Sequence, residues 1–331
     1  MSDMAYPSPQ DVRRVGIVGA GSVGAGWAAL FLAHGMDVVA HDPAPGAESF
    51  ARDFVSKAWV ALRDLGLTTL PAAPQDRLRF VGTIAQAVNQ VDLVQENVPE
   101  KPDLKERVLR EIDQATGEDV IIFSSTGGIP PTTLQASCAR PQRLVVVHPF
   151  NPSHLIPLVE VVGGAATNAE VVEWAMEFSR HLGKQPIHVK VETSGHMTNR
   201  LQMALVREAV ACLVDGVASA RDIDAAIRYG LGPRWALMGP LLTMHLAGGP
   251  GGMKGILDHA GAAVEDWWTP RSQPQLTADV KARLVDAANE VSDRASIADW
   301  IIWRDQNLVN VIRLQQKGQL QRPGTSETNH G

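Results

Sequence analysis

The sequence predicts an α/β fold in its first part, with a doubly wound sheet, followed by an all-α C-terminal domain. Short apolar runs of strand length alternate with helical patterns up to residue 191. Beyond residue 195 the apolar residues show helical spacing only. A chain of 331 residues is long enough for two domains. We therefore expect domains at 1–192 and 193–317, and a polar, disordered tail at 318–331.

A glycine-rich turn follows the first strand. Arg13–Val18 is a short apolar strand, and a helical pattern runs from the turn to about His34. Asp37–His41 has the pattern of a second strand, and Asp42 closes it. The turn itself is a G-x-G-x-x-G motif, Gly19-Ala20-Gly21-Ser22-Val23-Gly24.

Between a strand and a helix, this motif predicts a dinucleotide site of the Rossmann type. Its glycines allow a tight turn and bring the backbone close to a pyrophosphate, which then lies on a helix N-terminus. Asp42 can accept hydrogen bonds from a ribose 2′-hydroxyl and would repel a 2′-phosphate. NAD is therefore the expected cofactor, and FAD stays open from the motif alone.

The alternation of strands and helices continues as far as Phe123. Polar loops at the C-terminal ends of parallel strands form the ligand crevice of an open α/β sheet. Glu100, Ser125 and His148 each follow or end such a strand, so we expect all three to face one crevice. The expected elements are the helices Ala47–Leu65 and Asp103–Ala115 and the strands Leu78–Val81, Asp92–Gln95 and Asp119–Phe123.

Two apolar runs in the middle of the chain each hold one polar residue. Val145–Val147 leads into His148, and Pro157–Val162 contains Glu160. Such runs predict buried strands, in which a carboxylate is costly without a partner. If the two strands are neighbours, Glu160 would hold His148 in one tautomer and stabilise its imidazolium, which suits a general base. From spacing alone, separate backbone partners for the two side chains stay an alternative.

The remainder of the chain is expected to end the first domain and build a helical one. Helix Ala169–Leu182, with Asn168 as its cap, and strand Ile187–Val191 would end the first domain. Ser219 is expected to cap a helix of the second. The helices expected there are Gly195–Gly216, Ala220–Tyr229, Leu237–His245, Met253–His259, Ala278–Val291 and Ile297–Gln316.

Composition and charge exclude several classes of protein. A net charge of −6 provides no basic field for nucleic acid or an anionic membrane, and no apolar run approaches the length of a membrane span. Cys138 and Cys212 lie far apart, so we expect neither a disulfide framework nor a metal site. The polar residues 1–11 are typical of neither a signal peptide nor an anchor. We expect a cytoplasmic protein with a small-molecule substrate.

Six motifs together resemble the 3-hydroxyacyl-CoA dehydrogenase family across nearly the whole chain. The resemblance implies a two-domain NAD-dependent dehydrogenase whose helical domain also forms a homodimer. The matching segments are Gly19–Gly24, Glu96–Glu100 with Lys105, Ser124–Thr126, His148–Pro152, Leu158–Val161 and Gly195–Arg200.

The resemblance also assigns roles to single residues. It implies that His148 and Glu160 are the catalytic pair and that Asn199 orients the substrate; without it, Asn199 would be taken for a solvated helix end. NAD is expected on the glycine motif and Asp42. Its nicotinamide end would meet Val98, Glu100, Lys105, Ser125 and Asn151, and the substrate would meet Ser125, Gly127, Asn199 and Arg234.

The C-terminal half favours one branch of this family. Gly230–Pro240 and Thr243–Leu246 resemble the branch that holds lambda-crystallin, L-gulonate 3-dehydrogenase and carnitine dehydrogenase, which act on free 3-hydroxy acids. Residues 51–79 lack the lysine cluster of typical CoA-using members. Arg234 can grip a carboxylate bidentately, or it caps a helix or bridges subunits. We expect an L-gulonate-like acid slightly ahead of L-carnitine, whose ammonium group would need an aromatic cage, for which the candidates are Trp235, Trp267 and Trp268.

One position departs from the family. Gly127 stands where the family has a serine that contacts substrate and cofactor. The change could reflect a bulkier or altered substrate, or weaker activity. Three alternatives therefore stay open: action on a 3-hydroxyacyl-CoA, reduction of a C=N bond, and a crystallin-like protein that binds NAD but has little activity.

Overall fold

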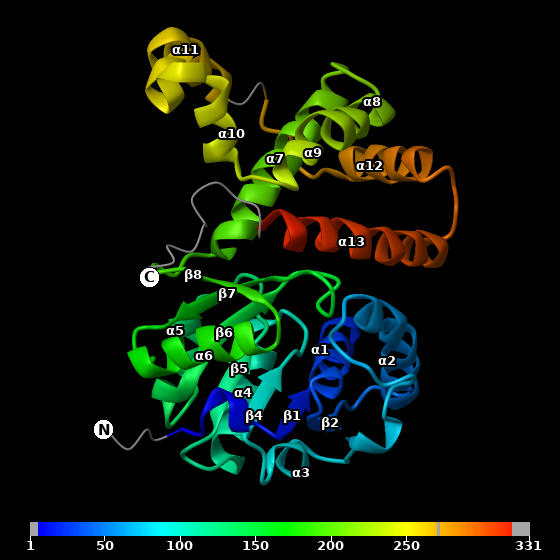
Figure 1. Ribbon diagram of the computed structural model, residues 1–331, viewed down its shortest axis with the longest axis vertical. Coiled ribbons are helices and arrows are strands. Elements are labelled where there is room, and N and C mark those ends of the chain that lie inside the picture. The colour runs from blue at the N-terminus through cyan, green and yellow to red at the C-terminus, as the bar shows by residue number, and fades with distance from the viewer. Residues whose placement is uncertain (1–5, 270–271, 320–331) are drawn as a thin grey trace, which may run out of the picture. The chain divides into compact units, whose positions relative to one another are not determined.

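The computed structural model describes residues 6–269 and 272–319 (Figure 1). The chain divides into two compact units, Met1–Arg200 and Leu201–Gly331. Residues 320–331 of the tail predicted to be disordered lie outside the described residues. No helix in the described part of the chain is long and apolar enough to cross a membrane.

The first unit is built on an eight-stranded sheet in the order β3-β2-β1-β4-β5-β6-β7-β8. Neighbouring strands are parallel except β6 and β7, which are antiparallel. The expected α/β fold is confirmed. The strands are β1 Arg14–Val18, β2 Asp37–His41, β3 Leu78–Phe80, β4 Leu93–Glu96, β5 Ile121–Ser124, β6 Leu144–Pro149, β7 Leu158–Gly163 and β8 Gln185–His188.

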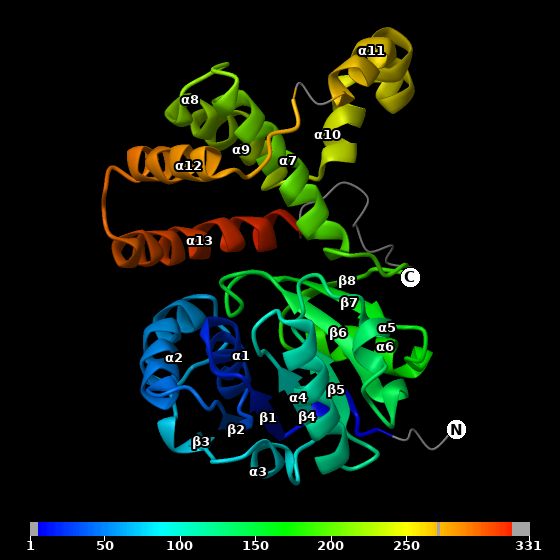
Figure 2. The same ribbon diagram turned by 180° about the vertical axis from the view of Figure 1, so that it is seen from behind.

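Helices cover both faces of this sheet, as Figures 1 and 2 show from opposite sides. Successive strand residues point to opposite faces, so Ile121 and Phe123 of β5 join one apolar cluster and Ile122 joins another. The first cluster takes its helical residues from α1, α2 and α6, the second from α3, α4 and α5. The helices are α1 Ser22–Ala33, α2 Ala47–Asp64, α3 Ile84–Val88, α4 Pro102–Ala115, α5 Pro131–Gln135 and α6 Ala169–His181.

The edge strand β8 differs from the expected strand Ile187–Val191. Its paired residues run from Gln185, opposite Leu158, to His188, opposite Val161. An edge strand is partly exposed and shows little alternation in its sequence, so the apolar pattern misplaces its bounds by two or three residues. The expected adjacency of the two strands in the middle of the chain is confirmed, because β6 and β7 pair directly.

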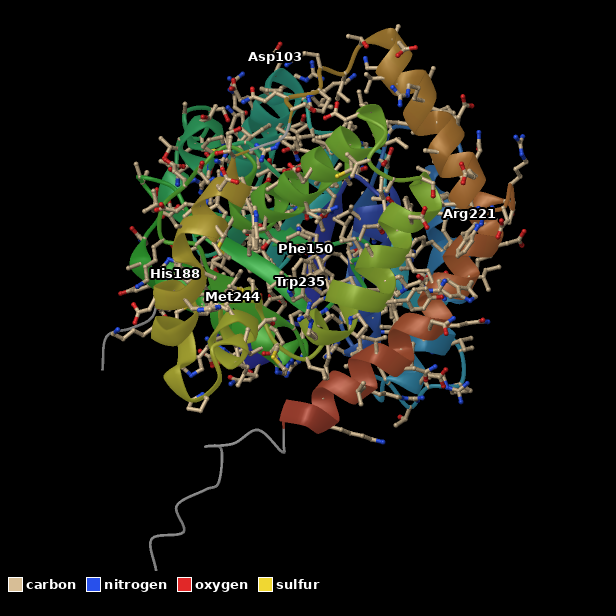
Figure 3. The ribbon with its side chains drawn as sticks, turned by 90° about the horizontal axis from the view of Figure 1, so that it is seen from above. Asp103, Phe150, His188, Arg221, Trp235 and Met244 are labelled. Carbon is tan, nitrogen blue, oxygen red and sulfur yellow. The ribbon has the colours of Figure 1, made fainter. Side chains whose placement is uncertain are left out.

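The second unit is helical in its described residues, as expected. Helix α7 starts in the first unit at His196 and continues into the second. The Ser219 hydroxyl accepts a hydrogen bond from the Asp222 amide, which confirms the expected cap. Arg221, labelled in Figure 3, belongs to α8. Its guanidinium forms an ion pair with Asp293, just beyond α12, at 2.6 Å. The helices are α7 His196–Val214, α8 Ala220–Ala225, α9 Gly232–Trp235, α10 Pro240–Ala247, α11 Gly252–Trp268, α12 Ala278–Val291 and α13 Ile297–Gln319.

Several helices of this unit start or end away from their expected bounds, α10 and α11 among them. Helix α10 begins at Pro240, since proline lacks an amide hydrogen and fits the first turn. Helix α11 extends nine residues past the expected end at His259, as far as Trp268. Trp267 and Trp268 are 74% and 71% exposed, so they are not core residues of this chain.

Candidate active site

The glycine-rich turn between β1 and α1 has the shape of a pyrophosphate cradle. A Cβ on Gly24 would lie 2.0 Å from the Gly19 carbonyl oxygen, and one on Gly19 would lie 2.8 Å from the Asn97 backbone. These two glycines therefore allow close packing. A Cβ on Gly21 would meet nothing within 4 Å. No side chain caps α1 at Gly21, so its first amides are available to an anion.

Two cavities lie near this turn, and each is lined by residues predicted to bind NAD. The first, of about 630 Å³, is lined by Asp42, whose Oδ2 accepts a 2.8 Å hydrogen bond from the Ala20 amide of the turn. The second, of about 530 Å³, is lined by Val23 of the turn. That Asp42 binds the adenosine ribose and the second cavity the nicotinamide stays a prediction. Besides Val23, five predicted site residues line the second cavity: Val98, Glu100, Ser125, Gly127 and Asn199.

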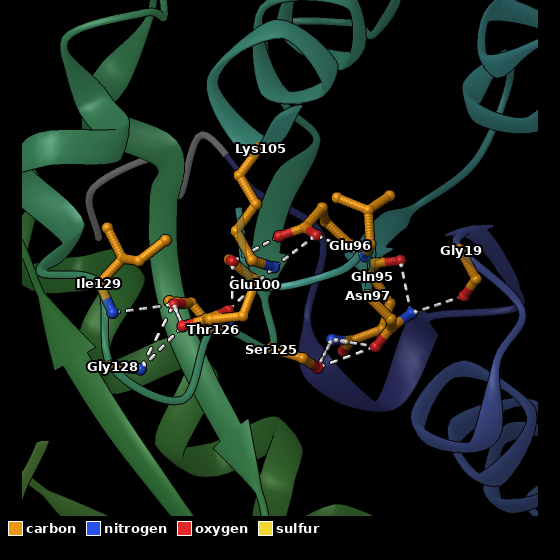
Figure 4. A network of polar contacts seen from close by, with 12 residues as sticks. Gly19, Gln95, Glu96, Asn97, Glu100, Lys105, Ser125, Thr126, Gly128 and Ile129 are labelled. Carbon is orange, nitrogen blue, oxygen red and sulfur yellow. Dashed lines mark hydrogen bonds and ion pairs between the residues drawn. The ribbon is translucent and has the colours of Figure 1, made fainter. Parts of the chain in front are cut away.

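A buried polar network supports the second cavity (Figure 4). Glu96, at the end of β4, binds the Lys105 ammonium at 2.8 Å and accepts a 2.5 Å hydrogen bond from the Ser124 hydroxyl. Glu100 accepts hydrogen bonds from the Thr126 hydroxyl at 2.5 Å and the Gly128 amide at 3.0 Å. These bonds fix the loop after β5 against the loop after β4.

Three predicted cofactor contacts have distinct surroundings. Lys105 is only 1% exposed, and its ammonium lies 3.6 Å from a Glu100 oxygen. It is therefore buried behind the residues that line the cavity. The Ser125 hydroxyl donates to Asn97 and accepts from Gln95, both at 2.8 Å. Asn151 is exposed. The contacts of all three with NAD stay predictions.

The pairing of β6 with β7 places His148 directly opposite Glu160. The two side chains meet through His148 Nδ1 and Glu160 Oε2 at 2.9 Å, with His148 7% exposed and Glu160 fully buried. Burial raises the pKa of Glu160, but hydrogen bonds from His148 and Thr198 more than offset this and lower its pKa below the ordinary value. An ionised Glu160 accepts the Nδ1 hydrogen, which leaves the Nε2 lone pair free to take a proton.

The second oxygen of Glu160 holds the start of α7. Oε1 accepts hydrogen bonds from the amides of Met197 at 3.1 Å and Thr198 at 2.7 Å. The positive end of the helix also favours the carboxylate charge. One carboxylate therefore positions both the histidine and the helix turn that carries Asn199.

Asn199 and Gly127 complete the arrangement around His148. The Asn199 side-chain amide donates to the Gly127 carbonyl at 2.8 Å, which leaves its nitrogen one further hydrogen to donate, and Asn199 lines the second cavity. A Cβ on Gly127 would lie 3.2 Å from His148 Nε2 and 3.3 Å from Asn199 Nδ2. The absence of a side chain at 127 therefore leaves the space beside both atoms open. A hydroxyl oxygen bound there can give its proton to His148 and accept from Asn199.

Sequence reasoning missed two residues of this site. Thr126 links Glu100 to the loop after β5, and fully buried His196 contacts the Thr126 carbonyl from α7 at 3.1 Å. Both lie within the segments that match the family. Neither is an isolated polar residue in an apolar run, which was the feature that indicated a partner for His148 and Glu160. Arg234 belongs to α9 of the other unit. No group of three or more His, Cys, Asp or Glu among the described residues could hold a metal ion.

Comparison with known proteins agrees with this geometry. Residues 14–193 match the NAD-binding domain of 3-hydroxyacyl-CoA dehydrogenase, and residues 195–288 match its C-terminal domain. An L-carnitine dehydrogenase of Streptomyces coelicolor is 49% identical over 92% of this chain and 96% of that protein. One from Pseudomonas aeruginosa is 45% identical over 91% of this chain and 94% of that protein.

Solved structures show the same fold. The crystal structure of 5-formyl-3-hydroxy-2-methylpyridine 4-carboxylic acid 5-dehydrogenase, described as an NAD⁺-dependent dismutase, superposes with a TM-score of 0.79 at 32% identity. The superposition covers 92% of this chain and 99% of the chain in that crystal structure. With both family domains matched in order, the chain belongs to the 3-hydroxyacyl-CoA dehydrogenase family and is an NAD-dependent oxidoreductase.

Proposed function

We propose that the protein oxidises the C3 hydroxyl of a free L-3-hydroxy acid, with L-carnitine as the first candidate. The observation that carries the reaction is the contact of His148 with an ionised Glu160, with His148 Nε2 and the amide nitrogen of Asn199 both beside Gly127, which lines the second cavity. That cavity adjoins the glycine-rich turn, where the chain binds NAD.

The chain's own residues would handle the proton and the oxygen. Bound NAD⁺ supplies the hydride acceptor at C4 of its nicotinamide. His148 takes the hydroxyl proton on Nε2, while Glu160 stabilises the imidazolium that results. The free amide hydrogen of Asn199 stabilises the carbonyl oxygen as it forms. Gly127 leaves room for that oxygen between the two side chains.

Most of the cationic side chains in residues 51–79 already have partners within the chain, which argues against a CoA thioester as the substrate. Residues 51–79 contain five cationic side chains, the candidates for holding CoA phosphates. Arg52 binds Glu48 and two backbone carbonyls, and Lys57 pairs with Asp53. Arg63 and Arg77 also have internal partners, the Pro71 carbonyl and Asp37. Phosphate binding would compete with these contacts, so a free acid fits this surface better.

Two observations favour L-carnitine over L-gulonate. The relatives described above include two named L-carnitine dehydrogenases, at 49% and 45% identity. Glu100 is the single charged residue among the described residues that line the second cavity, with the Lys105 ammonium 3.6 Å from one of its oxygens. Its carboxylate would attract the ammonium group of L-carnitine, whereas the hydroxyl groups of L-gulonate are neutral. The exposed rings of Trp235, Trp267 and Trp268 are candidates for an ammonium cage. The preference for L-gulonate stays a prediction without such support.

Three further expectations belong to the same proposal. Arg234 is exposed on α9 and would anchor the substrate carboxylate. The helical unit exposes large apolar side chains such as Leu241 and Ile297, which supports the expected homodimer. A cytoplasmic location stays a prediction.

The deciding experiment measures NADH formation with NAD⁺ and four substrates: L-carnitine, L-gulonate, L-3-hydroxybutyrate and 3-hydroxybutyryl-CoA. We expect kcat/KM for L-carnitine to exceed the others by about tenfold or more, a difference of about 1.4 kcal/mol in transition-state binding. The matched control is His148→Gln, which should bind NAD⁺ normally and lose turnover by orders of magnitude.

Each other outcome rejects a defined part of the proposal. Turnover of the CoA ester alone would reject the free acid but not the catalytic pair. A preference for L-gulonate would reject L-carnitine and keep the reaction. No turnover at all, with NAD⁺ bound, would reject the oxidation, and reduction of a cyclic imine by NADH would then be the next assay.

A further inference from the structure

Gly195 and the first turn of α7, which follows it, contact three consecutive carbonyls of the loop after β5. The Gly195 amide donates to the Gly128 carbonyl at 3.0 Å. Asn199 donates to the Gly127 carbonyl at 2.8 Å. His196 contacts the third, the Thr126 carbonyl, through Nε2 at 3.1 Å. The loop that borders the reacting oxygen is therefore positioned by α7.

His196 is an unusual residue for this place. Its side chain is fully buried, and its Nδ1 has no hydrogen-bond partner. Its backbone φ is +47°, in the left-handed region that a non-glycine residue seldom adopts. An unpaired buried nitrogen and this backbone both cost free energy. A phenyl ring would fill similar space without the unpaired nitrogen, so packing alone gives no reason for an imidazole here.

The contact of Nε2 with a carbonyl fixes the tautomer. A carbonyl only accepts, so Nε2 carries the hydrogen and Nδ1 is bare in the neutral ring. The His196 ring lies 5.6 Å from the His148 ring, between centroids. Burial, and then the neighbouring His148, lower the pKa of His196, against the Thr126 carbonyl and the Glu160 and Glu100 carboxylates, which raise it. The ring therefore stays uncharged beside the catalytic histidine.

We propose that His196 is a positioning residue for hydride transfer: its Nε2–H holds the Thr126 carbonyl and so aims the Gly127 carbonyl at Asn199. The Asn199 amide then keeps its second hydrogen on the substrate oxygen. An uncharged ring also leaves His148 free to become the only cation of the pair during turnover. This inference rests on the proposed oxidation of a 3-hydroxy acid.

The first test compares His196→Phe with His196→Gln. Phenylalanine keeps the ring and removes the donor, whereas the glutamine amide can place its nitrogen near the position of Nε2. Both variants carry the same left-handed backbone, so their difference isolates the hydrogen bond. In His196→Phe we expect kcat to fall about 10- to 100-fold, the effect of a misplaced catalytic group. The affinity for NAD⁺ should change little, and the isotope effect with C3-deuterated substrate should rise.

The rescue by glutamine decides between positioning and packing. His196→Gln should recover most of the lost kcat. Wild-type kcat in His196→Phe would overturn the proposal, and so would equal losses in the two variants.

The second test uses no turnover. Nitrogen-15 NMR of histidine-labelled wild-type protein at pH 7.5 should show one imidazole with hydrogen on Nε2 and none on Nδ1. This imidazole should be absent from the His196→Gln spectrum. A doubly protonated ring, or hydrogen on Nδ1 alone, would overturn the proposal. If the wild-type protein oxidised none of the acids, the proposed function would fail, while this spectrum would still decide the state of His196.

Discussion

Glu160 shows how one buried side chain can serve two parts of a site. Its Oε2 receives the His148 hydrogen bond, and its Oε1 receives two amides from the first turn of α7. A fully buried carboxylate is costly without partners, and here each oxygen has at least one donor. The charge that the histidine needs is therefore kept in place by the helix that carries Asn199.

Gly127 is the residue at which a side chain would crowd both His148 and Asn199. In Gly127→Ala the new Cβ would lie 3.2 Å from His148 Nε2 and 3.3 Å from Asn199 Nδ2, closer than ordinary contacts. The two side chains would have to shift by a few tenths of an ångström, so we expect kcat to fall about 10- to 100-fold. Steady-state kinetics and NAD⁺ binding check this, with unchanged binding expected.

Two further variants separate volume from chemistry at this position. Gly82→Ala is the control, because its Cβ would approach only the end of Gln86, at 3.6 Å. Gly127→Ser adds a hydroxyl to the same Cβ. The ratio of kcat between Gly127→Ser and Gly127→Ala therefore measures the contribution of the serine hydroxyl that the family has at this position. Full activity in Gly127→Ala would show that the open space is not needed.

At the scale of an element, the strand–turn–helix unit β1–α1 assigns different tasks to its glycines. In Gly21→Ala the Cβ would meet no protein atom within 4 Å, so the fold should tolerate it. The methyl group would instead occupy the approach of the pyrophosphate. We expect NAD⁺ affinity to fall about tenfold or more, with the melting temperature nearly unchanged. Calorimetric titration and thermal unfolding check both parts.

Gly24→Ala should behave in the opposite way. Its Cβ would lie 2.0 Å from the Gly19 carbonyl oxygen, a clash that only backbone movement can relieve. We therefore expect a clear loss of stability from this variant. Equal melting temperatures for the two variants would contradict the division of tasks.

Elements with a local signal could be predicted from the sequence, and contacts between distant elements mostly could not. The glycine turn, β6 and β7 each carry a continuous pattern. Two isolated polar residues in apolar strands pointed to a His148–Glu160 pair, but the resemblance to the family was needed to favour that pair over separate backbone partners. The burial of Lys105 against Glu96 gives no such pattern, since both are ordinary polar residues in the sequence. The contact of His196 with the Thr126 carbonyl joins backbone and side chain 70 residues apart.

At the scale of the whole molecule, α7 joins the two units. The first compact unit ends at Arg200, whereas the sequence predicts a domain boundary between residues 192 and 193. Residues 195–199 lie in the first unit because their donors bind the loop after β5 and Glu160. The same helix then continues to Val214, so the element that carries Asn199 also begins the helical unit.

The stability of the molecule should depend on a lysine outside the active site. Lys184 is buried, and its ammonium donates to the carbonyls of Ser153 at 2.5 Å and Ile156 at 2.8 Å. The same group lies 5.5 Å from the centre of the Trp27 ring. Burial lowers the pKa of Lys184 from 10.5 to about 7.

The lowered pKa of Lys184 predicts that the free energy of unfolding rises with pH. Between pH 7 and 10.5 the unfolded chain holds the Lys184 proton and the folded chain does not, so the free energy of unfolding increases with pH. Below pH 7 both states are protonated and the contribution is constant. From pH 7 to pH 9 we expect a gain of about 2 kcal/mol, measured by urea unfolding, that Lys184→Met lacks. The exposed Lys57→Met is the control and should keep the gain. The comparison of variants cancels the contribution of the other titrating groups. If the free energy of unfolding rose equally with pH in the wild type and in Lys184→Met, the buried lysine would not be neutral in the folded protein.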